Sequence, residues 1–122
     1  MNILIVDDNP DVRYSIEDAL SSNNKTFQIY QACSGEECLE KLNYLKIDLV
    51  LMDIMMPGLD GVRTVQLIRK TPNFKNVKIA FLTAKSDDTT REIASLGGDL
   101  FLTKPIEPKN LLNSIDGLMK NK

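Results

Sequence analysis

The stretch Leu49–Gly61, LVLMDIMMPGLDG, constrains the fold more than any other part of the chain. Its apolar run leads directly to a carboxylate at Asp53, and Pro57-Gly58 then breaks the chain direction. A short run that is apolar on both faces of the pleat is typical of a parallel strand buried between two layers of helices. Asp53 would therefore end this strand and face the crevice where open α/β sheets bind ligands. Taken alone, an aspartate after a strand is more often a turn or capping residue.

Apolar runs that alternate with helical patterns continue along the whole chain. The predicted strands are Asn2–Val6, Phe27–Gln31, Asp48–Asp53, Val77–Leu82 and Leu100–Leu102. N-cap signals at Asn9, Ser34 and Asp60 predict three helices, and Ser34 with Glu37 fits a capping box. A helix of weak propensity is expected after Asp88, and a last helix is lined by Leu111, Leu112, Ile115 and Leu118.

Five strands that alternate with five helices predict an α/β fold with a parallel sheet and helices on both of its faces. The strand at Phe27 alternates apolar with polar residues and therefore reads as an edge strand, whereas the first, third and fourth strands read as buried. We expect the doubly wound, flavodoxin-like strand order 2-1-3-4-5, with the switch point between strands one and three. A single domain over residues 1–122 is expected, because a chain of this length can bury one core.

The composition excludes several classes of function. Fifteen basic and seventeen acidic residues give a net charge of −2, so no basic field attracts nucleic acid. The absence of histidine excludes Ser-His triads and histidine zinc sites. The first acids, Asp7 and Asp8, come too early for a signal peptide or membrane span, so we expect a cytoplasmic protein. Cys33 and Cys38 form no disulfide framework or zinc set, and both are expected to be buried.

Polar residues fall at the ends of four of the predicted strands. Asp7 and Asp8 end the first strand, and Asp53 ends the third. Three neighbouring carboxylates repel one another unless a cation neutralises them, and a set of oxygen ligands alone favours a hard ion such as Mg²⁺. Asp53 could then attack phosphorus, while Thr83 and Lys104 at the last two strand ends stabilise the developing charge. Singly these residues have ordinary structural explanations, but their joint placement at one sheet edge favours function.

The segments IVDDN, LMDIMMPGLDG, FLTA and FLTKP resemble the motifs of response-regulator receiver domains of two-component phosphorelays, which are CheY-like. The resemblance extends from Ile3 to about Met119. It implies that Asp53 is the phospho-acceptor and that Asp8 binds Mg²⁺ directly. It also implies that Asp7 binds the ion through water and that the Met55 backbone carbonyl is a further ligand.

Other positions acquire expected roles from the same resemblance. Thr83 and Lys104 would contact the phosphoryl group, and Phe101 would be the aromatic residue whose rotamer reports activation. Lys104-Pro105 would be a cis peptide. Met55 and Lys85 would tune how fast the phosphoryl group is lost. Two positions depart from the usual motif, since Ile106 stands where phenylalanine is common and Gly98 where alanine is common, which concerns the stiffness of the output face.

The resemblance also implies the partners. A sensor histidine kinase, a phosphotransfer protein or a small phosphodonor would deliver the phosphoryl group. The surface formed by helix 4, strand 5 and helix 5 would then bind a downstream protein or a fused output domain. No direct contact with nucleic acid or membrane is expected of this domain. It would be a signalling switch rather than an enzyme, catalysing at most its own phosphorylation and dephosphorylation.

Two other classes of function remain open from the residues alone. A phosphohydrolase of the haloacid dehalogenase type also uses an aspartate nucleophile, Mg²⁺ and a lysine, but it needs a second acid where this chain has Met55 and a cap domain to enclose its substrate. A flavodoxin-like FMN binder needs a hydroxyl-rich phosphate loop, whereas here the loop reads Asp-Asn-Pro after Asp7, and its acids would repel a phosphate.

Overall fold

The computed structural model describes residues 1–22, 26–54, 56, 58, 60–74, 76–83 and 97–120. The elements are β1 (Asn2–Val6), α1 (Pro10–Ser21), β2 (Gln28–Ala32), α2 (Gly35–Leu42), β3 (Leu49–Asp53), α3 (Gly61–Lys70), the 3-10 turn η1 (Pro72–Phe74), β4 (Lys78–Thr83), β5 (Leu100–Thr103) and α5 (Pro108–Lys120). The weak helix expected after Asp88 lies outside these described ranges.

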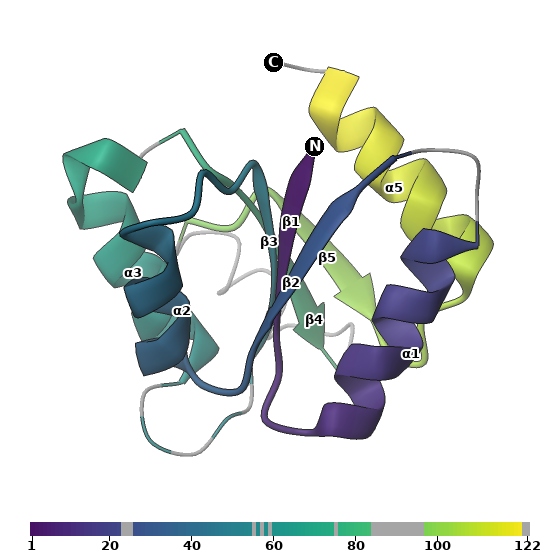
Figure 1. The fold of residues 1–122 in the computed structure, drawn as a ribbon, viewed down its shortest axis with the longest axis horizontal. Helices are drawn as coiled ribbons and strands as arrows, with labels where there is room; N and C mark the ends of the chain where they lie inside the picture. The colour runs from purple at the N-terminus through teal and green to yellow at the C-terminus, as the bar shows by residue number, and fades with distance from the viewer. Residues whose placement is uncertain are drawn as a thin grey trace.

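The five strands form one parallel sheet in the order β2-β1-β3-β4-β5, which confirms the predicted topology. Val6 pairs with Met52, and Asp53 pairs with Leu82, so the central strands end at the same level of the sheet. Figure 1 shows these carboxyl ends together at one end of the molecule, opposite both chain termini. The order therefore brings the polar residues that end β3 and β4, and those that follow β1 and β5, to one edge.

The sheet is the middle layer of three. α1 and α5 cover one face, and α2 and α3 cover the other (Figure 1). Successive residues of β1 pack against opposite layers: Ile3 and Ile5 contact the α1 and α5 side, and Leu4 and Val6 contact the α2 and α3 side. All four are completely buried, which explains why this strand is apolar without alternation.

The helices begin at the predicted capping residues. The side chain of Asn9 accepts a hydrogen bond from the Asp11 amide, and that of Asp60 accepts one from the Arg63 amide. The capping box at α2 is confirmed on one side, because Ser34 accepts from the Glu37 amide. The return bond differs, since Glu37 Oε1 accepts from the amide of Cys33 at 2.6 Å, one residue before the N-cap. This bond holds the pKa of the Glu37 carboxyl below its ordinary value.

The prediction that both cysteines are buried is right for Cys38 and wrong for Cys33. Cys38 lies on the inner side of α2, and burial raises the pKa of its thiol to about 12. Cys33 directly follows the edge strand β2 and precedes the N-cap of α2, so no second layer covers it.

The two thiols should therefore differ in reactivity. A pH near 8 is well below the Cys38 pKa of about 12, so the buried Cys38 thiol is almost entirely protonated. Cys33 is exposed, so a reagent can reach it. We expect one rapid alkylation, at Cys33, and labelling of Cys38 only on unfolding or at strongly alkaline pH. Peptide mass spectrometry after a short iodoacetamide pulse checks this, and Cys33→Ser should lose the rapid label. Rapid labelling of both thiols in the wild type would contradict the burial of Cys38.

A side-chain clamp that the sequence did not indicate joins α3 to the entries of β4 and β5. Arg69 donates from Nη1 to the Val77 carbonyl at 2.7 Å and from Nε to the Gly97 carbonyl at 2.9 Å. Its Nη2 contacts Asp99 Oδ2 at 2.7 Å, and the same oxygen accepts from the Ile79 amide at 2.8 Å. The clamp fixes the start of β5, which is the strand that leads to Lys104.

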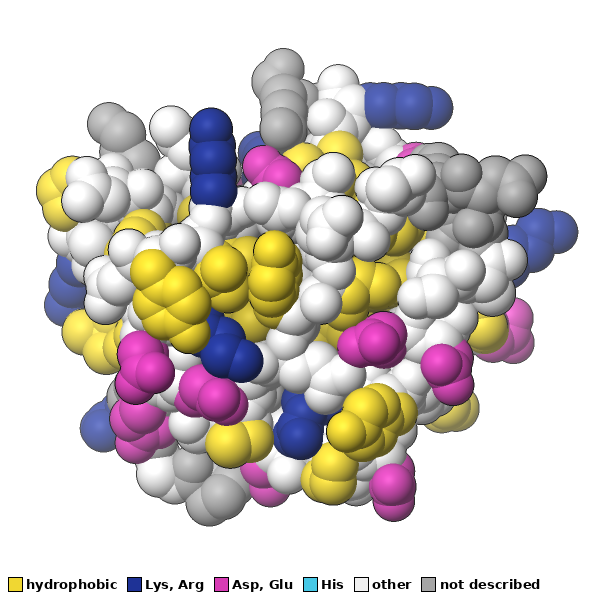
Figure 2. All heavy atoms as spheres, in the orientation of Figure 1, with side chains coloured by type: hydrophobic (Ala, Val, Ile, Leu, Met, Phe, Trp, Pro, Cys, Tyr) yellow, Lys and Arg dark blue, Asp and Glu magenta, His cyan; other side chains and the backbone are white. Residues whose placement is uncertain are grey.

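The charged surface agrees with the balanced composition. Lys and Arg side chains stand apart from one another on the face in Figure 2, with Asp and Glu side chains between them. Within the described ranges, no helix combines the length and apolar character that crossing a membrane requires.

Candidate metal and phosphoryl site

Three carboxylates meet at the carboxyl ends of the two central strands. Asp7 and Asp8 follow β1, Asp53 ends the neighbouring β3, and one carboxylate oxygen from each lies within 4.8 Å of the others. Asp7 and Asp53 are buried, at 1% and 6% exposure, whereas Asp8 is exposed. The parallel pairing of β1 with β3 brings them together, as the sequence predicted.

Asp7 is held through both its backbone and its side chain. Its amide donates to the Ala32 carbonyl at 3.1 Å, and its own carbonyl accepts from Arg13 Nη1 at 2.6 Å. Its carboxylate accepts from the Asn9 amide at 2.9 Å through Oδ1 and from Lys104 Nζ at 3.2 Å through Oδ2. A buried carboxylate with these partners has a fixed orientation.

Lys104 connects the last strand to the acids. Its amide donates to the Thr83 carbonyl at 2.7 Å, which continues the pairing of β4 with β5. Its ammonium lies 3.2 Å from Asp7 Oδ2 and 3.2 Å from Asp53 Oδ1. Burial alone would lower the pKa of Lys104, but the charges of Asp53 and Asp7 outweigh it and hold the pKa above its ordinary value. The lysine is therefore a cation at the site, and the peptide that follows it, Lys104-Pro105, is cis as expected.

Thr83 and Phe101 lie on the two strands beyond Asp53. Thr83 is buried at the end of β4, one residue past the level of Asp53, which pairs with Leu82. Phe101 is half-buried in β5, and its ring stacks on that of Phe81 with centroids 5.8 Å apart. Thr83 and Phe101 thus lie on the fourth and fifth strands, as the sequence predicted. The remaining expected site residues, Met55 and Lys85, lie outside the described residues.

Two glycines allow close packing around the site. A Cβ atom at Gly61 would lie 2.1 Å from the main-chain oxygen of Asp53, so the first turn of α3 reaches the end of β3 only because this residue has no side chain. A Cβ atom at Gly98 would lie 2.5 Å from the Phe81 ring. The absence of a side chain at Gly98 therefore leaves room for the Phe81 ring, which stacks on Phe101. In the sequence, the close approach at Gly61 is indicated only by the position of this glycine directly after the N-cap Asp60.

The donor set fits a hard divalent cation. The cluster contributes three carboxylates and one ammonium, and its ligand atoms are all oxygens. Such excess negative charge on buried groups is costly without a cation. Magnesium takes one or two carboxylates with water and phosphate oxygens, which this half-open group of acids permits.

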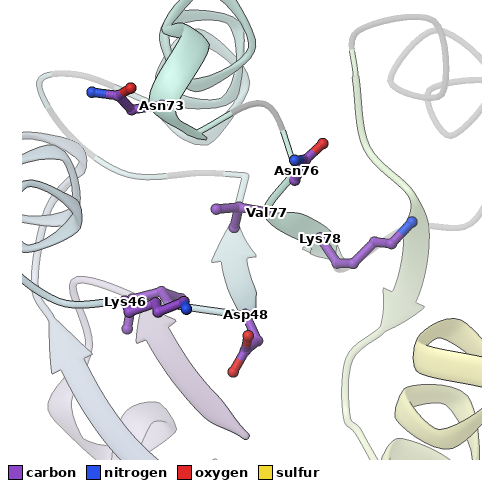
Figure 3. A pocket seen from close by; sticks show the side chains of 7 residues that line it. Lys46, Asp48, Asn73, Asn76, Val77 and Lys78 are labelled. Atoms are coloured by element: carbon purple, nitrogen blue, oxygen red, sulfur yellow. The ribbon is translucent and has the colours of Figure 1, made fainter. Parts of the chain in front are cut away.

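A cavity of about 550 Å³ lies at the opposite end of the sheet. Figure 3 shows that Lys46 and Asp48 come from the segment that enters β3, that Asn76 comes from the segment that enters β4, and that Lys78 lies at the start of β4. The Asp48 carboxylate accepts from the Asn2 amide at 2.8 Å, so it already has a partner. Because its lining residues lie at the amino ends of β3 and β4, this cavity is separate from the acids at the carboxyl ends.

The chain matches a family of known proteins. The family model of the response regulator receiver domain matches residues 3–116, so the chain belongs to that family. This is a receiver domain of the kind found in two-component response regulators.

Three relatives illustrate the similarity. The uncharacterized transcriptional regulatory protein YrkP of Bacillus subtilis is 39% identical over 89% of this chain and 45% of its own length. Sensor histidine kinase TmoS of Ectopseudomonas mendocina is 34% identical over 98% of this chain and 12% of its own length. The solved structure of a CheY-like response regulator receiver domain protein from Methanospirillum hungatei is 31% identical, with a TM-score of 0.81 over 99% of this chain and 98% of that one.

The chain spans less than half the length of the curated relatives it matches. Receiver domains thus occur among these relatives as parts of larger proteins, which include transcriptional regulators and histidine kinases. The part that this chain shares with them is the receiver domain.

Proposed function

We propose that this chain acts as one receiver domain over residues 1–122, accepts a phosphoryl group on Asp53 in a magnesium-dependent reaction and thereby changes its partner-binding surface. The observation that carries the proposal is the ammonium of Lys104, which lies 3.2 Å from both Asp7 and Asp53 with Asp8 beside them. Carboxylate nucleophile, cation and open acidic edge are the parts that phosphoryl transfer to aspartate requires.

The proposed magnesium ligands are the carboxylates of Asp8 and Asp53, Asp7 through a water molecule, and the Met55 backbone carbonyl. Asp8 suits direct binding because its side chain is exposed beside the two buried acids. When bound, the ion would neutralise charge on the phosphoryl oxygens.

In the transfer step, a carboxylate oxygen of Asp53 forms a bond to phosphorus while the bond from phosphorus to the donor atom breaks, and the donor keeps that electron pair. Lys104 and Thr83 contact the phosphoryl oxygens and stabilise their charge. Met55 and Lys85 tune how quickly water later removes the group. The domain acts on itself rather than turning over an external substrate.

The donor is a sensor histidine kinase, a phosphotransfer protein or a small phosphodonor. A cavity of about 460 Å³ between α1 and the segment before α5 supports protein docking beside the acids. Its lining residues are Asp11, Val12, Ser15, Ile16, Lys104, Pro105 and Ile106. An apolar floor next to Lys104 would let a donor side chain approach Asp53 with water excluded.

The output surface is proposed to be the one formed by the helix expected after Asp88, β5 and α5, and its partner is a downstream protein or a fused output domain. Phosphorylation draws Thr83 toward the phosphoryl group, and Phe101 turns inward into the space that Thr83 vacates. A hydrogen bond to a charged group contributes about 1.5 to 3 kcal/mol, which is much of what a population shift between two states needs. The domain itself acts in the cytoplasm, without direct binding to nucleic acid or membrane.

Magnesium should raise the melting temperature of the protein, because the ion removes repulsion within the acid cluster. At ten times the dissociation constant, mass action gives a stabilisation of about 1.4 kcal/mol. Thermal unfolding measured by circular dichroism against magnesium concentration checks this, and Asp53→Asn should reduce the dependence. A melting temperature that stays constant from zero to roughly tens of millimolar magnesium would count against the site.

The switch should be visible by NMR. Beryllofluoride, which mimics a phosphoryl group on a carboxylate, should shift resonances of Phe101 and of residues 97–103 as well as those around Asp53. Thr83→Ala should keep the shifts at Asp53 and lose those at Phe101, because the coupling depends on the hydroxyl. Shifts confined to the acids in the wild-type protein would overturn the coupling.

A further inference from the structure

Arg13 of α1 contacts the main chain of one of the three acids. Its Nη1 donates to the carbonyl oxygen of Asp7 at 2.6 Å, and its Nε donates to Gln31 Oε1 at 2.9 Å. Gln31 lies in the edge strand β2, and its Nε2 donates to Glu17 Oε1 at 2.6 Å. Arg13, Gln31 and Glu17 are all half-buried, so these contacts are partly shielded from water.

Each contact determines the direction of the next. The Glu17 carboxylate accepts from the amide nitrogen of Gln31, which turns the amide oxygen toward Arg13. The guanidinium of Arg13 is planar, so a bond from Nε to Gln31 sets the plane in which Nη1 donates. Lys41 of α2 also donates to the Gln31 carbonyl and holds this part of β2 from the other helical layer.

The carbonyl that Arg13 binds belongs to the same planar peptide as the amide of Asp8. A hydrogen bond that holds this carbonyl therefore also holds the orientation of the Asp8 amide, and with it the direction in which the Asp8 side chain leaves the backbone. Asp8 is exposed, so packing alone does little to set its carboxylate, whereas the Asp7 carboxylate is held by Asn9 and Lys104.

We propose that Arg13, oriented by Gln31, is a positioning residue for the metal site: it fixes the peptide between Asp7 and Asp8 so that both carboxylates face Asp53. The inference rests on the proposed magnesium site. Partners that orient ligands without touching the metal commonly change its affinity by tenfold or more.

A purely electrostatic role for Arg13 predicts the opposite sign. A positive charge near the acids repels Mg²⁺, so loss of the charge alone would strengthen binding. Loss of orientation would weaken it. Substitutions that preserve charge separate the two effects, and Gln31 is the more informative position because its replacement by methionine changes no charge.

The experiment is a magnesium titration followed by ¹⁵N NMR of the Asp8 amide in the wild type, Arg13→Lys, Gln31→Met and Gln28→Met. Gln28 lies exposed on the same strand and receives the same substitution, so it is the matched control. We expect about tenfold weaker magnesium binding in Arg13→Lys and roughly threefold weaker binding in Gln31→Met, with wild-type binding in Gln28→Met. In the metal-free protein the Asp8 amide nitrogen should shift in the first two variants, because its peptide carbonyl loses an oriented donor.

The outcomes distinguish this inference from the proposed function. Wild-type protein that binds no magnesium overturns the metal site and the positioning role together. Normal wild-type binding with unchanged or tighter binding in Gln31→Met overturns the positioning arrangement alone, whatever Arg13→Lys does. If Arg13→Lys fails to fold, the magnesium affinity of Gln31→Met still tests the positioning role.

Discussion

Asp53→Asn should reduce phosphoryl incorporation from acetyl phosphate to background. An amide lacks the negative charge that makes a carboxylate a nucleophile, so the variant loses the proposed acceptor while Lys104 and the neighbouring acids remain. The measurement is intact-protein mass spectrometry after incubation with acetyl phosphate and magnesium. The wild type should gain one acid-labile phosphoryl group, and chelation of magnesium should prevent the gain.

Two further variants sharpen this test. Asp18→Asn removes an exposed carboxylate of α1 and should label like the wild type. Asp8→Asn should label poorly even with magnesium, because a proposed ligand is lost. If Asp53→Asn and Asp8→Asn both retain full acid-labile labelling, the assignments of nucleophile and metal ligand are wrong.

Lys104→Met should destabilise the metal-free protein by about 3 kcal/mol, because removal of one partner from a buried ion pair leaves the other charge without compensation. Here the ammonium serves two carboxylates, whose side chains are 2% and 8% exposed. Methionine keeps most of the apolar stem, so loss of packing contributes little. Urea unfolding with a chelator present gives the free energy of unfolding directly.

Magnesium should stabilise Lys104→Met more than it stabilises the wild type, because in the variant the ion compensates charges that Lys104 normally compensates. Lys109→Met, at an exposed position of α5, is the matched control and should leave the free energy of unfolding nearly unchanged. Equal stability of Lys104→Met and the wild type in chelator would contradict the charge balance described for the acids.

The topology and the acid cluster could be predicted because both depend on periodicity. Buried parallel strands are apolar on both faces, as β1 and β3 are, and the edge strand reveals itself by alternation. Once the order of strands is set, their carboxyl ends must share one edge. The proximity of Asp7, Asp8 and Asp53 then follows from connectivity, without knowledge of any side-chain rotamer.

Contacts between side chains of distant elements could not be predicted in this way. Gln31 reads in the sequence only as a polar position of an edge strand, and its bond to Arg13 depends on how α1 lies across β2. The clamp made by Arg69 likewise depends on the positions of Val77 and Gly97 after folding. Cys33 was misjudged because its residue type favours burial, whereas its place before the N-cap of α2 leaves it exposed.

The chemical location of the phosphoryl group decides whether Asp53 is the acceptor. Hydride reduction converts an aspartyl phosphate to homoserine, which peptide mass spectrometry then places in the sequence. After treatment with acetyl phosphate and magnesium, we expect homoserine in place of Asp53 alone, and none when magnesium is chelated. Homoserine in place of Asp7 or Asp8, or phosphorylated protein that yields no homoserine, would contradict this expectation.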